Sequence, residues 1–205
     1  MKMKPIFLIL SVCFSLAFGL TVLASAASAD NETTPPAVKG EATPAAAGAP
    51  DTKTAEALKI HEPFIRQAFD LAILSAKKGN HPFGALLVYQ GNVILTAENA
   101  VITDNDPSRH AELNLLLQAR RKISREVLRE STLYVSTSPC MACCAAMWYS
   151  NVSKIVYGVS QEAFEKATGY HDGIRCDQLY RETDKKLEWT GPILEEEGLK
   201  VFGKN

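Results

Sequence analysis

The stretch TLYVSTSPCMACCAAMWYS, residues 132–150, determines how the middle of this chain folds. Residues 132–137 are mostly β-branched or aromatic, which is typical of a buried strand. Ser138 is a residue type that helix N-caps prefer, and Pro139 is tolerated at the first position of a helix. The sequence therefore predicts a strand over 132–137 that leads directly into a helix, with Ser138 as its N-cap.

Two cysteines lie in the first turns of that helix. Cys140 and Cys143 are three residues apart, so both sulfurs can point to one place on the helix surface. The positive end of the helix dipole lowers the pKa of a thiol there and favours the thiolate, the form that binds metals. Taken alone, the pair is also compatible with a redox dithiol or with half of a structural zinc site.

A second predicted helix, over 109–121 and capped by Asp106 or Ser108, begins with His110-Ala111-Glu112. One imidazole and two thiolates suit Zn²⁺, and three protein ligands leave the fourth position for water, as in catalytic zinc sites. Glu112 is about 200° around an ideal helix from His110, so the two side chains converge only if the metal lies beyond the helix end. The His-x-Glu pattern by itself also fits an ordinary helix start.

The rest of the pattern predicts an α/β domain. The expected strands of a hairpin around Gly91 and Asn92 cover 84–90 and 92–99, and another strand covers 154–159. Apolar residues at helical spacing predict helices over 62–78 and near 161–167, and helical patterns also cover 174–183 and 193–197. This order of elements predicts a mixed sheet that is covered by helices.

The chain has 205 residues, 46% of them hydrophobic, and a formal net charge of −1. Residues 1–29 combine a basic start, an apolar run and a final Ala-Ser-Ala, which predicts an export signal; the run is also long enough for an uncleaved membrane anchor. Residues 30–54, rich in Ala, Pro and Thr, are expected to form a flexible linker, and residues 55–205 one domain. The protein is therefore expected to be periplasmic or secreted.

The charge balance also bears on partners. Cleavage after Ala29 removes Lys2 and Lys4 and changes the net charge from −1 to −3. Because nucleic-acid phosphates are bound by clustered Lys and Arg, an acidic exported protein is not expected to bind nucleic acid. Contact with a membrane is expected only through an uncleaved leader.

The combination His-x-Glu followed by Pro-Cys-x-x-Cys is the signature of zinc-dependent nucleobase deaminases. Together with HPFGALLV at 81–88, AENAVITDNDPSRHAE at 97–112 and TLYVSTSPCMAC at 132–143, it makes the domain similar to the cytidine-deaminase-like superfamily. Bacterial guanine deaminases resemble it most, followed by tRNA-adenosine deaminases. The resemblance implies a three-layer α/β fold with a mixed sheet of about five strands, and a homodimer.

The resemblance also implies residue roles. His110, Cys140 and Cys143 would bind one catalytic zinc ion, and Glu112 would shuttle protons. The implied contacts with the base are the side chain of Asn99, the main chain of Ala111, the ring of Phe83 and the carboxylate of Asp172, which falls where guanine deaminases have a second proton-relay acid. One departure is Ser138, where the family usually has Glu.

These observations predict an enzyme that hydrolyses a ring amino group to a carbonyl and releases ammonia. The expected substrate is a purine base, with guanine favoured; cytosine or cytidine is the next alternative, followed by adenosine in RNA. An alternative of another class is an exported, zinc-stabilised binding module without turnover. Glu112 beside an open metal position argues against that module.

Two further cysteines, Cys144 and Cys176, belong to the predicted domain. Cys144 follows a predicted ligand by one residue, about 100° around the helix, so it is poorly placed as another ligand. Export would place both thiols in an oxidising compartment, where a disulfide between them is conceivable. Small buried or free thiols are nevertheless the expected state.

Overall fold

The fold is described from a computed structural model, which covers residues 56, 58–171 and 173–202. The export signal expected at 1–29 and the linker expected at 30–54 lie outside the described residues. Within the described part of the chain, every helix is too short or too polar to span a bilayer.

Five strands form one mixed sheet in the order β2-β1-β3-β4-β5. Strand β1 pairs antiparallel with both β2 and β3, whereas β3, β4 and β5 run parallel to one another. The carboxyl ends of β3 and β4 therefore lie side by side at one end of the sheet. The bounds of the strands are Gly84–Tyr89 (β1), Asn92–Glu98 (β2), Thr132–Thr137 (β3), Lys154–Val159 (β4) and Glu188–Thr190 (β5).

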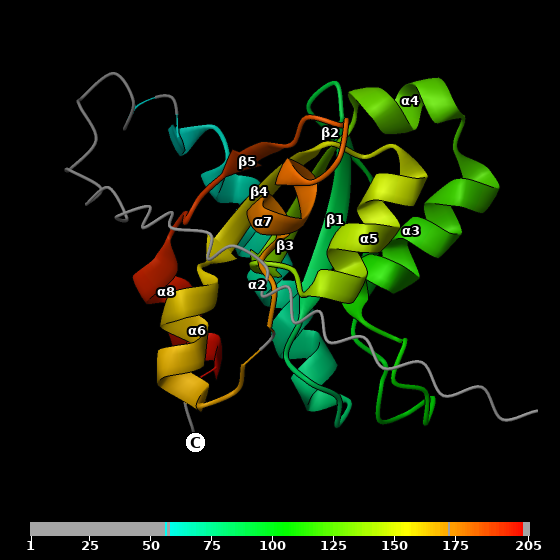
Figure 1. The fold of residues 1–205 in the computed structure, drawn as a ribbon. Coiled ribbons are helices and arrows are strands. Elements are labelled where there is room, and N and C mark those ends of the chain that lie inside the picture. Colours follow the sequence, from blue (N-terminus) through cyan, green and yellow to red (C-terminus); the bar gives the residue numbers. More distant parts are fainter. Residues whose placement is uncertain (1–55, 57, 172, 203–205) are drawn as a thin grey trace, which may run out of the picture. The chain divides into compact units, whose positions relative to one another are not determined.

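Helices cover both faces of this sheet (Figure 1). Helices α3 and α5 pack on one face, and α2, α6 and α8 pack on the opposite face. The predicted three-layer α/β architecture with a mixed sheet is therefore confirmed. The bounds of the helices are Glu62–Lys77 (α2), Ala111–Lys122 (α3), Arg125–Glu130 (α4), Met141–Ser150 (α5), Gln161–Thr168 (α6), Cys176–Arg181 (α7) and Glu195–Phe202 (α8).

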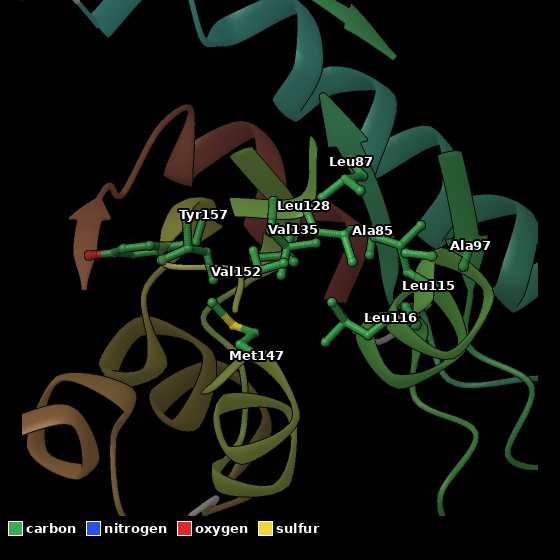
Figure 2. Packing of buried hydrophobic residues seen from close by; sticks show 14 residues of the cluster. Ala85, Leu87, Ala97, Leu115, Leu116, Leu128, Val135, Met147, Val152 and Tyr157 are labelled. Carbon is green, nitrogen blue, oxygen red and sulfur yellow. The ribbon is translucent and has the colours of Figure 1, made fainter. Parts of the chain in front are cut away.

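Alternate side chains of β3 enter two separate cores. Leu133 and Val135 belong to the core beneath α3 and α5, whereas Tyr134 between them belongs to the core beneath α2. This alternation follows from the two-residue period of a strand. Figure 2 shows the first core, in which the wholly buried Leu115 of α3 and Met147 of α5 meet the strand side chains.

Two glycines satisfy local requirements of the β1–β2 region. The hairpin turn consists of Gln90 and Gly91, whose φ angles are 49° and 76°, as in the two-residue turns that match the twist of paired strands. At Gly84, a Cβ atom would collide with the carbonyl oxygen of Ala68 and approach the Cβ of Leu71 to 2.5 Å. The absence of a side chain at Gly84 thus allows α2 to pack directly against β1.

The predicted helix starts are wrong by a few residues. His110 is the N-cap of α3, in place of Asp106 or Ser108, and Cys140 is the N-cap of α5, in place of Ser138. Neither side chain makes a capping hydrogen bond to its own helix. The imidazole and the thiol face each other instead, so these two N-cap positions serve the site between the helices.

Two short elements of the fold, α4 and β5, were not predicted from the sequence. Helix α4 has six residues and begins after Ser124, whose side chain accepts a hydrogen bond from the Val127 N–H. That serine is the one signal that could have located it. Strand β5 has three residues, which is too short for a periodic pattern. The helical patterns at 174–183 and 193–197 correspond to α7 and α8.

Candidate active site

Three metal-binding side chains meet between the first turns of α3 and α5. The Nδ1 atom of His110 lies 3.6 Å from the Sγ of Cys140 and 3.7 Å from the Sγ of Cys143, and the two sulfurs are 3.5 Å apart. Each residue offers one ligand atom, and all three atoms lie within 4.8 Å of one another. The fold brings them together because both helices begin at the same end of one face of the sheet.

Glu112 reaches the same place although it is only two residues from His110. As the N-cap, His110 has an extended backbone (φ −64°, ψ 152°), so its ring leaves the chain before the helical rotation begins. Glu112 belongs to the first turn of α3, and its Oε2 atom accepts a hydrogen bond from the Cys143 thiol at 3.5 Å. The convergence beyond the helix end that the spacing requires is thus present.

The electrostatics of the cluster follow from its burial. Burial raises the pKa of Glu112 to about 7, and the negative charge of Cys140 acts in the same direction. The hydrogen bond with Cys143, followed by that with His110, lowers the pKa of Cys140 to about 4. The pKa of Cys143 is raised by the same thiol pair and by burial. The hydrogen bond between the two sulfur atoms thus shifts the pKa values of Cys140 and Cys143 in opposite directions.

This donor set fits a zinc ion. Zinc in proteins takes thiolate and imidazole ligands in a tetrahedral arrangement, and a bound metal deprotonates a coordinating thiol. One imidazole and two sulfurs account for three of four positions, which is the composition of a catalytic site with one exchangeable position. His110, Cys140 and Cys143 are the residues that would hold the ion, and Glu112 is the carboxylate beside it.

A cavity of about 490 Å³ opens next to this cluster. Two predicted metal ligands, His110 and Cys140, line it, together with the predicted proton carrier Glu112. Ser138, which departs from the family pattern, lines it as well. Its other lining residues are His81, Pro82, Phe83, Asn99, Val101, Pro107, Thr137, Phe164, Thr168, Tyr170 and Phe202. The cavity has a size typical of small-molecule sites in proteins.

Asn99 is almost completely buried in the wall of this cavity, with 1% of its surface exposed. Its Oδ1 atom accepts a hydrogen bond from the Val101 N–H at 3.0 Å, and its backbone N–H donates to the carbonyl oxygen of Phe83 at 3.0 Å. Because the amide oxygen is already engaged by its own loop, the amide NH₂ is the part of the side chain left to contact a ligand.

Three aromatic rings from distant parts of the chain line the cavity together. Phe83, predicted to pack on a base, lies with Phe164 of α6 and Phe202 of α8, and the ring centroids are 5.2–5.7 Å apart. Sequence analysis did not identify Phe164 or Phe202 as site residues. Their only signal was membership of an apolar helix face, which equally describes a core residue.

The structure does not test two of the predicted contacts, those of Ala111 and Asp172. Ala111 is wholly buried in the core beneath α3 and is not one of the side chains that line the cavity. Its proposed main-chain contact with a base stays a prediction. Asp172 lies outside the described residues. Ser138 lines the cavity, and its backbone N–H donates to the carbonyl oxygen of Val159 at 2.8 Å, which ties the segment before Cys140 to β4.

Cys144 and Cys176 form a disulfide, so the expectation of free or simply buried thiols is wrong. Their Cα atoms are 5.4 Å apart, which is within the range that a disulfide spans. Both residues are wholly buried beside Tyr180, with Trp148 packed against them. The bond connects α5 to α7, neither of its cysteines lines the cavity, and Cys140 and Cys143 are not disulfide-bonded.

The geometry defines a zinc-type hydrolytic site in a three-layer α/β domain, and comparison with known proteins agrees. Residues 58–159 match the family described as the cytidine and deoxycytidylate deaminase zinc-binding region. A tRNA-specific adenosine deaminase from Buchnera aphidicola is 38% identical over 103 residues, covering 50% of this chain and 68% of the relative. Guanine deaminase from Bacillus subtilis is 32% identical over 129 residues, covering 62% of this chain and 80% of that relative.

The chain therefore belongs to this zinc-binding deaminase family, and it is a hydrolytic deaminase of the class that acts on nucleobases and nucleosides. A solved structure of guanine deaminase from Nitrosomonas europaea superposes with a TM-score of 0.57 at 20% identity, covering 67% of this chain and 79% of that structure. At that identity the superposition supports the fold alone.

Proposed function

We propose that the protein is an exported deaminase of a purine base, with guanine as the favoured substrate. The observation that carries the proposal is the position of Glu112. This buried carboxylate lies in the wall of the cavity, beside the three metal-binding side chains and in the same cavity as the amide of Asn99. A base in that cavity would have its amino group near the metal end and its polar edge near Asn99.

The chemistry divides between a metal ion and the side chains. Zinc bound by His110, Cys140 and Cys143 would supply Lewis-acid activation of a water molecule at neutral pH. Glu112 accepts a proton from the attacking water, whose oxygen forms the new bond to the ring carbon that bears the amine. The Glu112 carboxylic acid then returns protons to the ring nitrogen and to the departing amine. The C–N bond breaks, and ammonia leaves as the carbonyl forms.

The other cavity residues orient the base. The amide NH₂ of Asn99 donates a hydrogen bond to a ring nitrogen or a carbonyl oxygen of the base. Phe83 packs against the ring face, and the neighbouring rings of Phe164 and Phe202 hold Phe83 in place. The cavity has a volume of about 490 Å³ and is lined by Glu112 as well as by Phe202, so it has room for a second fused ring beside the one that carries the amine. This volume supports a purine over a pyrimidine.

The relatives support guanine and adenosine as alternative substrates. The similarity to guanine deaminase covers most of that relative, whereas the tRNA-specific adenosine deaminase has the higher identity over a shorter stretch. The expected export and the net charge of −3 after cleavage favour a free base, because RNA binding depends on a basic surface. We further propose a homodimer located outside the cytoplasm.

A substrate panel tests the proposal. The protein that begins at Asp30 is incubated with guanine, guanosine, cytosine, cytidine, adenine and an RNA stem-loop that carries an accessible adenosine, and ammonia release is measured. Guanine should give the highest kcat/KM. A preference for cytosine, cytidine or the RNA would overturn the assignment of substrate. Zinc-loaded protein that releases no ammonia from any of them would overturn the function itself. Cell fractionation and light scattering test the location and the dimer.

A further inference from the structure

The end of helix α2 contacts both sides of the cavity. One side, the first wall, consists of residues 81–83, and the other, the second wall, consists of residues 99–107; both contribute cavity-lining side chains. Two polar side chains from this region hydrogen-bond to the walls. They are Ser75, near the end of α2, and Asn80, which lies three residues beyond that helix.

Ser75 connects the two walls through one hydroxyl group. Its side chain is wholly buried, and its Oγ atom lies 2.7 Å from the carbonyl oxygen of His81 and 2.9 Å from that of Asn99. The first oxygen belongs to the first wall and the second to the second wall. A hydroxyl has one proton to donate, so the two carbonyl oxygens share it. This hydroxyl therefore holds the two walls together beside the backbone hydrogen bond from the Asn99 N–H to the carbonyl oxygen of Phe83.

Asn80 holds the turn that follows Asn99. Its Oδ1 atom accepts hydrogen bonds from the N–H groups of Ile102 and Thr103, both at 2.9 Å, and its Nδ2 atom donates to the Thr103 hydroxyl at 3.1 Å. The side chain of Asn80 is nearly buried, with 8% exposed. These bonds give the turn a fixed place relative to α2.

This turn also fixes the orientation of the Asn99 side-chain amide. The residue before Ile102 is Val101, which lines the cavity and whose N–H donates to Oδ1 of Asn99. A displacement of Ile102 and Thr103 would move this N–H and release the Asn99 amide from its single orientation. An amide that rotates freely presents donor and acceptor ends equally, so it no longer distinguishes one base edge from another.

We propose that Ser75 and Asn80 are positioning residues that fix the width of the cavity and the orientation of Asn99. This inference rests on the proposed function, because it assigns these residues a role in recognising the base. Neither residue lines the cavity. They act through the two walls, and their effect should therefore fall on substrate binding and on discrimination between bases, with the metal site left intact.

The test compares Asn80→Ala, Asn80→Asp and Ser75→Ala with Lys78→Ala in the full chain. Asn80→Asp keeps an oxygen that accepts from Ile102 and Thr103, so it should retain activity near the wild-type value. Lys78 lies in the same region but pairs with Glu98 on the surface, so its variant is the matched control. Asn80→Ala and Ser75→Ala should raise KM for the best base about tenfold, change kcat less than threefold and keep one zinc per chain.

A second readout needs no substrate. Amide hydrogen exchange at Ile102 and Thr103 should become faster in Asn80→Ala and stay slow in Asn80→Asp and Lys78→Ala. An unchanged KM, or exchange equal to that of the wild type, would overturn the proposal, and so would a loss of zinc from Asn80→Ala. If the wild type deaminated no base while exchange changed as expected, the proposed function would fail and the contact with the turn would stand.

Discussion

The two sides of the cavity differ in how they are built. On the metal side, Glu112 and the three metal-binding residues come from the first turns of two helices, in motifs of three or four residues. On the aromatic side, Phe83, Phe164 and Phe202 come from three distant places in the sequence and touch only in the folded protein. Local spacing thus places the metal-binding and acidic groups, whereas long-range packing assembles the aromatic lining of the cavity.

The largest effect is expected at the metal ligands. Cys143→Ser replaces a thiolate with a hydroxyl, which is a poor ligand for zinc, so the purified variant should contain no zinc and show no measurable ammonia release. Elemental analysis and the ammonia assay check both points. The variant Cys144→Ala, made in the same helix one residue away, should keep its zinc. Equal zinc loss in both would show that helix damage, and not ligation, is responsible.

The second-largest loss of activity is expected at Glu112, where zinc binding and turnover can be measured separately. Glu112→Ala should keep zinc but lower kcat by about 10²–10⁴-fold, the usual contribution of a positioned general acid–base group. Steady-state kinetics and zinc content are measured on the same sample. Activity close to that of the wild type would exclude Glu112 as the proton carrier.

A smaller effect is expected on the aromatic side. Phe83→Leu should raise KM about tenfold with little change in kcat, because contact between a base and an aromatic ring is worth about 1–3 kcal/mol. Phe64→Leu is the matched control, since Phe64 also pairs with an aromatic ring, that of Tyr134, but does not line the cavity. If both variants changed KM equally, the ring of Phe83 would have no special contact with the substrate.

The smallest effect on activity concerns the disulfide behind the metal helix. The double variant Cys144→Ala/Cys176→Ala should lower the free energy of unfolding by about 2–4 kcal/mol, because the bond restricts the unfolded chain. Zinc content and kcat should stay within about twofold, since neither Cys144 nor Cys176 lines the cavity. Denaturant unfolding and kinetics measure the two quantities. A large loss of zinc would instead show that the disulfide is needed to keep the metal-binding residues in place.

The sequence was informative where chemistry depends on neighbours in the chain. The zinc set and Glu112 were identified from His110-Ala111-Glu112 and from the spacing of Cys140 and Cys143, and the layered fold from alternating strand and helix patterns. It was uninformative where residues meet through tertiary structure. The Cys144–Cys176 bond, which the sequence offered only as an alternative to free or buried thiols, joins residues that are 32 positions apart, and Phe202 lines the cavity from α8. The roles of Ser75 and Asn80 depend on backbone atoms, which a side-chain motif does not reveal.

The origin of the metal ligands in two helices has a thermodynamic consequence. His110 at the start of α3 and the cysteines of α5 are separated by about 30 residues that include the whole of α4 and β3. An unfolded chain does not hold these three groups together, so zinc binds the folded form preferentially and its binding free energy adds to the stability of the domain. The concentration of available zinc would then determine the stability of the folded enzyme as well as its activity.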